Sequence, residues 1–452
     1  MAAAAVVSEP ARTLRIGLFL FATGYHPAGW RLPEARTDGA FDLTFLIELA
    51  RTVERAKFDF FFLGDGLATD PDMARLYPSQ VVRLEPFTMM GAIAAATRDV
   101  GLVVTANTTY AEPYNVARML ASLDHLSHGR IAWNVVTGAD PLAAFNFGRA
   151  DHWDTDRRYD QAEEFVAVVR DLWDSWEDDA LLRDARSGAF LDPTKVHRLD
   201  HVGPHFSVAG PLNVARPPQG HPPLVQAGTS ERARQLGARL ADVVFTAQTT
   251  IEDARAFRTD LRGRAAACGR PATEPAVLPG LVPIVADTVS GAQELYDRLG
   301  AFVDAEAALI SLQASVGATA QTLAELGPAA AVDRLPSAAA SHVAAAEAAI
   351  GRPVQTLGDL ARFQLASGRG HRLIVGDGAR VADSMQEWLE AGAADGFNIC
   401  PPYLPGGLER FTQLVVPELQ RRGIFRREYE GPTFRHILGL PRPPSRFAVK
   451  RR

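Results

Sequence analysis

Residues 100–147 constrain the fold more than any other part of this chain. They contain an apolar run at 100–105, a polar loop, an amphipathic stretch that Pro113 opens and Gly129 ends, and a second apolar run at 131–136. Two buried strands joined by a helix are the repeating unit of a parallel sheet. Both strands end in small polar residues, and parallel barrels bind ligands at the carboxyl ends of their strands. The segment therefore predicts a parallel α/β structure with a ligand site at this edge.

The alternation of apolar runs and helical patterns continues on both sides of this segment. Strands are predicted at residues 14–21, 58–63, 100–105, 131–136, 224–227, 242–246, 277–285 and 396–400. Helices are predicted at residues 41–57, 86–97, 113–127, 158–176, 230–240, 251–268, 379–391 and 410–422. The count and order of the strands predict an eight-stranded parallel (β/α)8 barrel of the TIM type with insertions, rather than an open doubly wound sheet.

The spacing of these elements predicts one domain with two excursions. Residues 12–440 are expected to form a single barrel domain, with flexible tails at 1–11 and 441–452. Residues 178–220 are rich in Gly, Pro and polar side chains and predict an irregular excursion with a short hairpin around 205–212. Residues 300–370 lie in an Ala-rich, mainly helical region that predicts a second excursion. Because barrel loops carry specificity, we expect these excursions to choose the substrate.

Composition excludes several classes of function. With 47 Lys and Arg against 53 Asp and Glu, the net charge is −6, and no basic field indicates nucleic-acid binding. Cys268 and Cys400 lie far apart and form neither a disulfide framework nor a metal-binding pattern. No apolar run approaches the length of a membrane span, and the N-terminal residues do not form a convincing signal peptide. These features predict a cytoplasmic protein with no membrane or nucleic-acid partner.

The best-known nucleotide and metal motifs are absent. No GxGxxG opens the first strand–helix turn and no GxxxxGK[ST] occurs, which argues against Rossmann and P-loop sites. His197, His201 and His205 recur every four residues, but Gly203 and Pro204 place them in a loop, so no metal site is predicted. A glycosidase on a barrel would need paired carboxylates across its mouth, and the strand ends offer one prominent acid.

Four residues at strand ends are candidates for ligand contacts. Asp65 stands between two glycines after the strand at 58–63, where it either accepts a hydrogen bond from a ligand or caps the next turn. Thr229 and Ser230 open the helix at 230–240. Their hydroxyls and the helix N-terminus suit a phosphate, although a plain N-cap is the alternative. His26, near Trp30 after the first strand, is either an acid/base or substrate contact or an ordinary loop histidine.

Several segments resemble the bacterial luciferase-like superfamily, and within it the nitrilotriacetate monooxygenase group of flavin-dependent monooxygenases. They occur in the family's order and cover most of the chain outside residues 300–370. The segments are HPAGWRLPEA, KFDFFFLGDG, LEPFTMMGAIAAAT, VGLVVTANTTYAEPYNVARMLASLDHLSHGRIAWNVVTG, AAFNFG, RRYDQAEEFVAVVRDLWDSW, HFSVAGPLNVARPPQGHPPLVQAGTSERAR and ADGFNICPPYLPGGLERF.

The resemblance implies a barrel that binds reduced FMN (FMNH2) non-covalently after a separate NAD(P)H:FMN reductase has made it. O2 then adds to the flavin, and the flavin peroxide or hydroperoxide oxidises a carbon, nitrogen or sulfur centre of a small organic molecule. The protein orients the flavin and keeps water away, while the cofactor supplies the chemistry. The resemblance also implies a homodimer.

The resemblance assigns roles to particular residues. His26 matches, less exactly, a loop position on the substrate side and is the catalytic candidate. The remaining matches are cofactor-binding positions: Asp65 near the flavin ring, Thr105 and Asn134 at the ends of the third and fourth strands, Thr155 and Tyr159 of the HDERY-like motif by the phosphate arm, and Thr229 and Ser230 of the AGSS-like phosphate loop.

Two departures from the family pattern affect this assignment. Thr155 stands where the HDERY motif has its histidine, although His152 lies three residues earlier, and Gly138 stands where the family has the serine of NVVTS. Both changes could loosen flavin binding. A deazaflavin-dependent oxidoreductase on the same barrel and a non-catalytic flavin-binding partner subunit stay open as alternatives, although Tyr159 and the AGTS segment fit the FMN group better.

Overall fold

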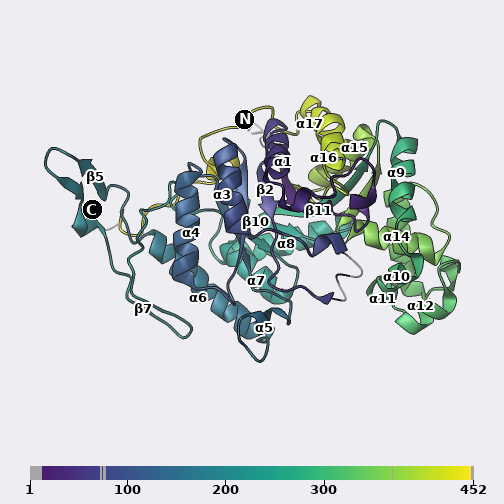
Figure 1. Ribbon diagram of the computed structural model, residues 1–452, viewed down its shortest axis with the longest axis horizontal. Coiled ribbons are helices and arrows are strands. Elements are labelled where there is room, and N and C mark those ends of the chain that lie inside the picture. Colours follow the sequence, from purple (N-terminus) through teal and green to yellow (C-terminus); the bar gives the residue numbers. More distant parts are fainter. Residues whose placement is uncertain (1–12, 72–73, 75–77, 369, 449–452) are drawn as a thin grey trace, which may run out of the picture.

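The computed structural model describes residues 13–71, 74, 78–368 and 370–448, and its centre is a closed parallel barrel (Figure 1). Each strand pairs in parallel with the next in chain order, and the last pairs with the first, Arg15 lying beside Gly396. The barrel strands are β1 (Arg15–Leu20), β2 (Phe60–Leu63), β3 (Gly101–Asn107), β4 (Ile131–Val136), β9 (Leu224–Ala227), β10 (Val243–Thr246), β11 (Ala276–Val285) and β13 (Gly396–Ile399). The predicted eight-stranded barrel is confirmed.

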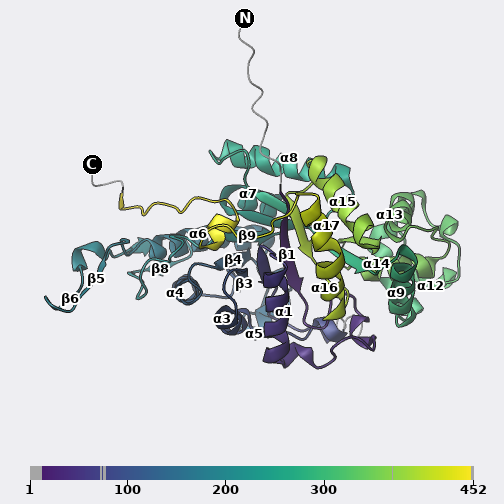
Figure 2. The same ribbon diagram turned by 90° about the horizontal axis from the view of Figure 1, so that it is seen from above.

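Helices surround the barrel and cover the outer faces of its strands (Figure 2). They begin at side-chain caps that the sequence supplies: the Asp42 carboxylate accepts the Phe45 N–H at 3.2 Å, and the Asp154 carboxylate accepts the Arg157 N–H at 2.9 Å. The helices are α1 (Leu43–Arg55), α3 (Pro86–Ala96), α4 (Pro113–Leu126), α6 (Thr155–Trp173), α7 (Glu231–Leu240), α8 (Ile251–Ala267), α15 (Gly378–Glu390), α16 (Gly406–Arg410) and α17 (Val416–Arg421).

Most apolar side chains of the barrel strands belong to two clusters, one between strands and helices and one inside the barrel. On β2, Phe61 packs outward with the helices, whereas Phe60 and Phe62 pack inward with residues of β3, β4, β9, β10 and β11. Phe434 of the short helix α18 (Phe434–Ile437) belongs to the inner cluster, and its ring lies against Gly101 at the start of β3. The interior is therefore a packed core that α18 closes at the amino-terminal ends of the strands.

A helical lobe follows β11 and leads into a strand that the prediction missed. The lobe has its own apolar cluster and lies on one side of the barrel (Figure 1). Its helices are α9 (Val289–Ala301), α10 (Ala305–Ile310), α11 (Gln313–Val316), α12 (Ala320–Leu326), α13 (Ala340–Ile350) and α14 (Leu357–Ser367). The missed strand, β12 (Arg372–Gly376), pairs in parallel with Leu281–Val285 of β11. The sequence analysis assigned no strand to these five residues, which directly follow the helical region, and their pairing with β11 is long-range.

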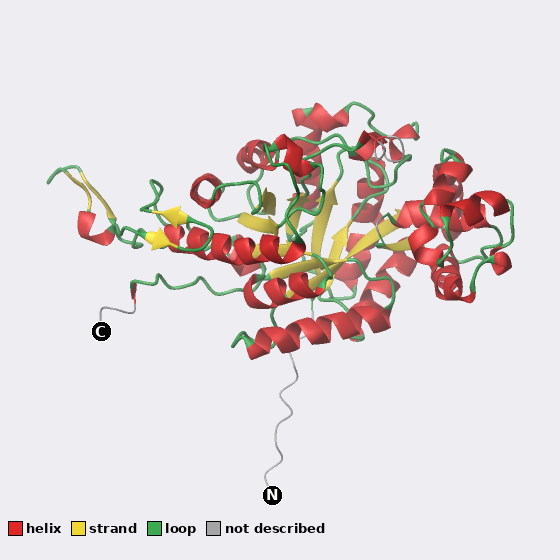
Figure 3. Cartoon of the chain, turned by 90° about the horizontal axis from the view of Figure 1, so that it is seen from below, coloured by secondary structure: helices red, strands yellow, loops and turns green. Residues whose placement is uncertain are grey.

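Residues 178–208 leave the end of α6 as an arm that projects from the barrel (Figure 3). The arm contains two antiparallel hairpins, β5 (Leu181–Asp184) with β6 (Ala189–Leu191) and β7 (His201–Val202) with β8 (Ser207–Val208). The hairpin expected around 205–212 thus begins at residue 201, and β5–β6 was not predicted. Short polar strands of this kind give little periodic signal in a sequence.

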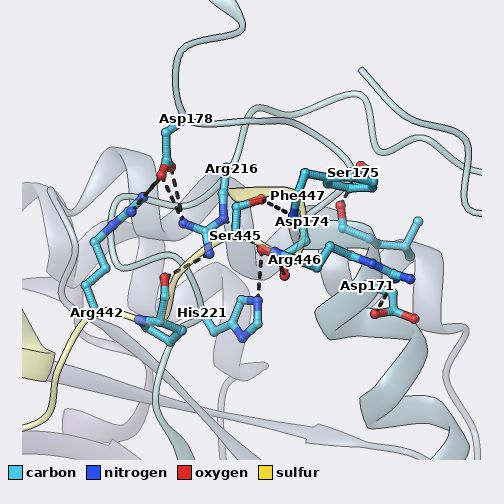
Figure 4. Close-up of polar contacts among 12 residues, drawn as sticks. Asp171, Asp174, Ser175, Asp178, Arg216, His221, Arg442, Ser445, Arg446 and Phe447 are labelled. Atoms are coloured by element: carbon cyan, nitrogen blue, oxygen red, sulfur yellow. Dashed lines mark hydrogen bonds and ion pairs between the residues drawn. The ribbon is translucent and has the colours of Figure 1, made fainter. Parts of the chain in front are cut away.

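Buried charges hold the root of the arm (Figure 4). The Arg216 side chain is 1% exposed, and it donates to the carboxylates of Asp174 at 2.7 Å and Asp178 at 3.2 Å. Arg442, near the end of the chain, also donates to Asp178, at 2.9 Å. Its position ties the C-terminal segment to the arm.

The described part of the C-terminal segment makes further contacts with the same region. The Phe447 ring stacks on His197 with 3.8 Å between centroids, and Arg446 pairs with Asp171 at 2.6 Å. The sequence predicts a flexible tail from residue 441, whereas residues 442–447 have these specific partners. Their partners lie more than 200 residues earlier in the chain, so local composition carries no sign of them.

We expect Asp395→Asn to destabilise the barrel by about 3 kcal/mol, since breaking a buried ion pair leaves its cations uncompensated. Asp395 precedes β13 and accepts from Arg258 at 2.7 Å, Arg262 at 3.0 Å and the Val277 N–H at 2.9 Å. Burial would raise the pKa of Asp395, but the Arg258 hydrogen bond and the two guanidinium charges lower it. Urea unfolding followed by circular dichroism measures the change.

The matched control is Asp383→Asn, which breaks the ion pair with Arg422. The Asp383 side chain is 70% exposed, and an exposed ion pair contributes about 0–1 kcal/mol. Equal losses of unfolding free energy in the two variants would contradict the structural role of Asp395.

Candidate active site

A cavity of about 670 Å³ opens at the carboxyl ends of β2, β4 and β9. Four residues predicted from the sequence, Asp65, Tyr159, Thr229 and Ser230, line it together. Its other walls come from the loop after β2, the turn after β4 and the last residues of β9. The cavity therefore lies at the rim where parallel barrels bind their ligands, and its size suits a cofactor or a small molecule.

One end of the cavity is formed by the start of α7. Ser230 caps this helix, its hydroxyl accepting the Ala233 N–H at 3.3 Å, and both Thr229 and Ser230 are exposed. Gly228 before them has φ +142°, and a Cβ there would lie 2.9 Å from the Ala233 methyl. The close turn thus requires glycine and leaves the first N–H groups of the helix open to the cavity. Unpaired N–H groups and the helix dipole make this end suitable for an anion.

Tyr159 forms the adjoining wall. The residue is 9% exposed and packs with Ala162 of its own helix and with Ala233 and Leu236 of α7. This packing fixes α6 against α7, so the tyrosine and the α7 N-terminus keep a constant spacing. Thr155, also predicted to bind the cofactor, is the exposed first residue of α6 and is not part of the cavity wall.

Asp65 and Arg83 lie at the opposite end of the cavity wall. Asp65 accepts the Gly66 N–H at 2.8 Å. Burial raises the pKa of Asp65, although the Gly66 hydrogen bond and the Arg83 charge oppose this change. The Arg83 guanidinium lies 5.9 Å from the centroid of the Phe21 ring. This end of the cavity therefore offers a cationic donor and a carboxyl acceptor.

Thr105 and Asn134 are register partners on β3 and β4, and both face the barrel interior. The Asn134 amide donates to the Thr105 hydroxyl at 2.9 Å, and that hydroxyl donates to the Leu63 carbonyl at 2.7 Å. Asn134 Oδ1 is buried and accepts no hydrogen bond within the described chain. A buried acceptor without a donor is rare, and this oxygen is available to a donor outside the described chain. Neither Thr105 nor Asn134 is part of the cavity wall.

His26 is not brought to the cavity wall. It is 1% exposed, and its ring Nδ1 accepts the backbone N–H of Ala28 at 3.1 Å. The backbone N–H of His26 donates to the Pro402 carbonyl at 3.0 Å. Burial lowers the pKa of His26 to about 4, so its ring is neutral at neutral pH. These contacts match the loop-histidine alternative, and a substrate role for His26 stays a prediction.

The sequence analysis missed two residues that shape the turn after β4. Asn107 at the end of β3 accepts the N–H groups of Thr109 and Tyr110 and lines the cavity. Arg158 donates to the Gly138 carbonyl. Arg158 directly precedes Tyr159 in the motif, and this adjacency was the only feature of the sequence that could have identified it. Asn107 follows the strand predicted at 100–105, in the polar stretch where ligand contacts were expected.

Gly138 has a geometric reason for its departure from the family pattern. Its φ of +68° lies in the left-handed region, and a Cβ there would come within 2.5 Å of the Asn107 amide nitrogen. A serine at this position would therefore strain the backbone and displace Asn107. The backbone conformation of this turn therefore requires glycine at position 138.

No group of three or more His, Cys, Asp or Glu side chains among the described residues could hold a metal ion. Two of the regularly spaced histidines have separate partners instead: His197 lies 3.0 Å from Glu177, and His201 lies 2.8 Å from Glu164. In the part of the chain that the structure describes, no helix is both long enough and apolar enough to cross a membrane.

Comparison with known protein families settles the classification. The luciferase-like monooxygenase family matches residues 19–395. The chain belongs to this family. It is 44% identical to N-acetyl-S-(2-succino)cysteine monooxygenase of Bacillus subtilis (strain 168), over 97% of this chain and 99% of that protein. It is 45% identical to nitrilotriacetate monooxygenase component A of Aminobacter aminovorans, over 97% and 98% of the two chains.

A solved structure agrees with this assignment. The crystal structure of DmoA from Hyphomicrobium sulfonivorans matches with a TM-score of 0.84 and 31% identity, over 94% of this chain and 92% of that one. Family membership confirms the predicted luciferase-like barrel and the predicted enzyme class, a flavin-dependent monooxygenase acting on a small organic molecule. It also confirms a flavin as the cofactor class.

We expect His26→Asn to reduce the loss of stability in acid. The pKa of His26 is about 4 in the folded chain and 6.5 in an ordinary environment, so protonation favours unfolding. Neutral His26 therefore contributes about 3 kcal/mol to the free energy of unfolding. This contribution is complete above pH 6.5 and is lost as the pH falls towards 4. Asparagine keeps an acceptor for the Ala28 N–H but does not titrate. Unfolding free energies at pH 7 and pH 4.5 measure the difference.

The exposed His205 provides the control for this experiment, and His205→Asn should follow the wild type at both pH values. If the unfolding free energies of His26→Asn and the wild type fall equally between pH 7 and pH 4.5, folding does not lower the pKa of His26 and the prediction is wrong.

Proposed function

We propose that the protein is the oxygenase of a two-component system, which takes FMNH2 from a separate NAD(P)H:FMN reductase and uses O2 to oxidise a small organic molecule. One observation carries this proposal: a single cavity joins an anion-binding helix terminus to the Asp65 end, at the strand ends of a luciferase-like barrel. A phosphate-bearing flavin has this division between an anionic arm and a polar ring.

Each predicted cofactor-binding residue of the cavity wall then has a specific task, as do Asn134 and Thr105, which are not part of that wall. Thr229, Ser230 and the first N–H groups of α7 hold the phosphate, and the Tyr159 hydroxyl donates to it. Asp65 accepts from the polar edge of the ring system. Asn134, oriented by Thr105, offers its free oxygen to a ring N–H. When bound, reduced FMN supplies the electrons for oxygen activation, and these residues fix its position and exclude water.

The wider setting follows from the same proposal. The name of nitrilotriacetate monooxygenase component A supports a system of separate components, in which a reductase supplies the reduced flavin. We place the protein in the cytoplasm, where NAD(P)H is available, and propose a homodimer of single-domain chains spanning residues 12–440. His26 stays the proposed residue on the substrate side, and Thr155 acts on the cofactor indirectly through Arg158.

Anaerobic titration of the purified protein with FMN and FMNH2 tests the proposal. We expect both to bind and FMNH2 to bind more tightly. Product formation from a screened substrate should then require a reductase, NAD(P)H and O2 together. Binding of a reduced deazaflavin with no affinity for FMN or FMNH2 would replace the proposal with a deazaflavin-dependent oxidoreductase. Flavin binding without oxidation of any substrate would favour a non-catalytic partner subunit.

We expect Tyr159→Phe and Ser230→Ala each to weaken FMN binding about tenfold, since a hydrogen bond to a charged group contributes about 1.5–3 kcal/mol. Ser230 also caps α7, so its variant should lose about 1 kcal/mol of stability while staying folded. Fluorescence titration gives the affinity, and thermal unfolding gives the stability. Ser122→Ala, on the outer side of α4, is the control. Unchanged FMN affinity in both test variants would contradict the phosphate assignment.

A further inference from the structure

The turn after β4 is held from behind by a cluster that does not line the cavity. Gly138 and Ala139 of this turn are cavity residues, whereas Arg158, His152 and Tyr110 are not. The three come from the start of α6, the loop before it and the loop after β3. Their contacts are directed at the turn and at one another.

Arg158 is fully occupied in shaping this region. It is 8% exposed, and its guanidinium donates to the Gly138 carbonyl, to the Trp153 carbonyl at 3.0 Å and to the Thr155 hydroxyl at 3.1 Å. A planar guanidinium offers its donors in a fixed arrangement, so contacts in three directions fix the place of the one to Gly138. Arg158 therefore acts as a brace between α6 and the turn.

His152 and Tyr110 support the same turn. His152 Nδ1 lies 2.7 Å from the Tyr110 hydroxyl, and Nε2 is buried beside the Gly138 backbone without a well-aligned hydrogen bond. The Tyr110 ring is itself held between Phe147, stacked at 4.8 Å, and the Arg149 guanidinium at 4.9 Å. The pair therefore lies beside the same peptide that Arg158 contacts.

The charge state of His152 fits a supporting role. Burial and the Arg158 charge lower the pKa of His152, as does Arg149 more weakly, while Asp140 and the Gly138 backbone oppose them. The ring is therefore neutral at neutral pH. It fills space and forms a hydrogen bond behind the turn without adding a second cation beside Arg158.

The planarity of the peptide bond carries this arrangement into the cavity. In a trans peptide, the C=O of one residue and the N–H of the next point in opposite directions. Because the Gly138 carbonyl points at Arg158, which is not part of the cavity wall, the Ala139 N–H points away from Arg158, and Ala139 itself lines the cavity. Within the described chain this N–H has no acceptor. It joins the same cavity as Tyr159 and the N-terminus of α7.

We propose that Arg158, supported by the His152–Tyr110 pair, is a positioning unit that turns the Gly138–Ala139 peptide so that the Ala139 N–H binds the flavin phosphate. This inference rests on the proposed function. It gives Thr155 a role as the hydroxyl that orients Arg158. It also explains why glycine occupies position 138, since the left-handed backbone there is what allows the carbonyl to face Arg158.

The test compares FMN with riboflavin, which has the same ring system and no phosphate. We expect Arg158→Met to weaken FMN binding about tenfold, the effect of losing one hydrogen bond to a charged group, and to leave riboflavin binding unchanged. Tyr110→Phe removes one hydroxyl and should cause a smaller loss, again for FMN alone. Arg158→Lys should restore FMN binding in part. Phosphorus NMR of bound FMN should show a shifted phosphate resonance in each variant.

Arg157→Met is the matched control, because Arg157 is the neighbouring residue and its guanidinium lies on Trp153, 3.9 Å from the ring centroid. It removes the same charge without touching Gly138. If Arg157→Met weakens FMN as much as Arg158→Met does, general electrostatics replace positioning and the inference is wrong.

The remaining outcomes separate this inference from the proposed function. A wild-type protein that binds FMN no better than riboflavin would overturn the phosphate site itself. If the wild type prefers FMN to riboflavin and Arg158→Met keeps the same preference, the positioning role of Arg158 is wrong and the phosphate site stands. Equal loss of both ligands in Arg158→Met would reduce Arg158 to a structural role. An unchanged preference in Tyr110→Phe would remove the His152–Tyr110 pair from the unit.

Discussion

Closure of the barrel is the constraint on which the rest of the structure depends. When β13 pairs with β1, all eight strands share one direction and their carboxyl ends meet at one rim. Asp65 and Ser230, 165 residues apart in the chain, come to line the same cavity only because of this arrangement. An open sheet would place them on an extended edge with no enclosing wall. The buried contacts of Asp395 beneath the barrel serve the same closure, since they join α8 to β11 and β13.

Backbone conformation, more than side-chain chemistry, builds the anion-binding end of the cavity. Gly228 lets the chain turn tightly into α7, and Gly138 lets the opposite turn direct a carbonyl away from the cavity. Both glycines stand where a Cβ would collide with a neighbour. The two turns line the same cavity from different strands, so an anion bound there would meet N–H groups from both. Such donors lose no side-chain entropy when they bind, which suits a site that must release and rebind its cofactor.

The barrel could be predicted because its signals are local. Strands buried on both faces appear as short apolar runs, and the predicted runs at 131–136 and 224–227 have the bounds of β4 and β9. β12 and the β5–β6 hairpin of the arm were not predicted, because distant or weak pairings define them. In the site, residues directly after strands were found, but Arg158 was missed because it acts through a contact with the backbone of Gly138, 20 residues earlier in the chain. Thr155 was placed by the motif alone, whereas His26 was also a candidate from its position after the first strand. Neither residue is part of the cavity wall.

The cavity wall also changes where substrate choice should be sought. The sequence analysis assigns that role to the excursions at 178–220 and 300–370, yet none of the described wall residues belongs to either. The loop between β2 and α3 contributes instead, from Asp65 to Arg83, with apolar and charged side chains side by side. Asp65 at the start of this loop has a proposed role with the cofactor, whereas the other described wall residues of the loop, from Gly66 to Arg83, have none. Selection for a new substrate would therefore act first on described wall residues of this loop such as Leu67, Gln80 and Val81.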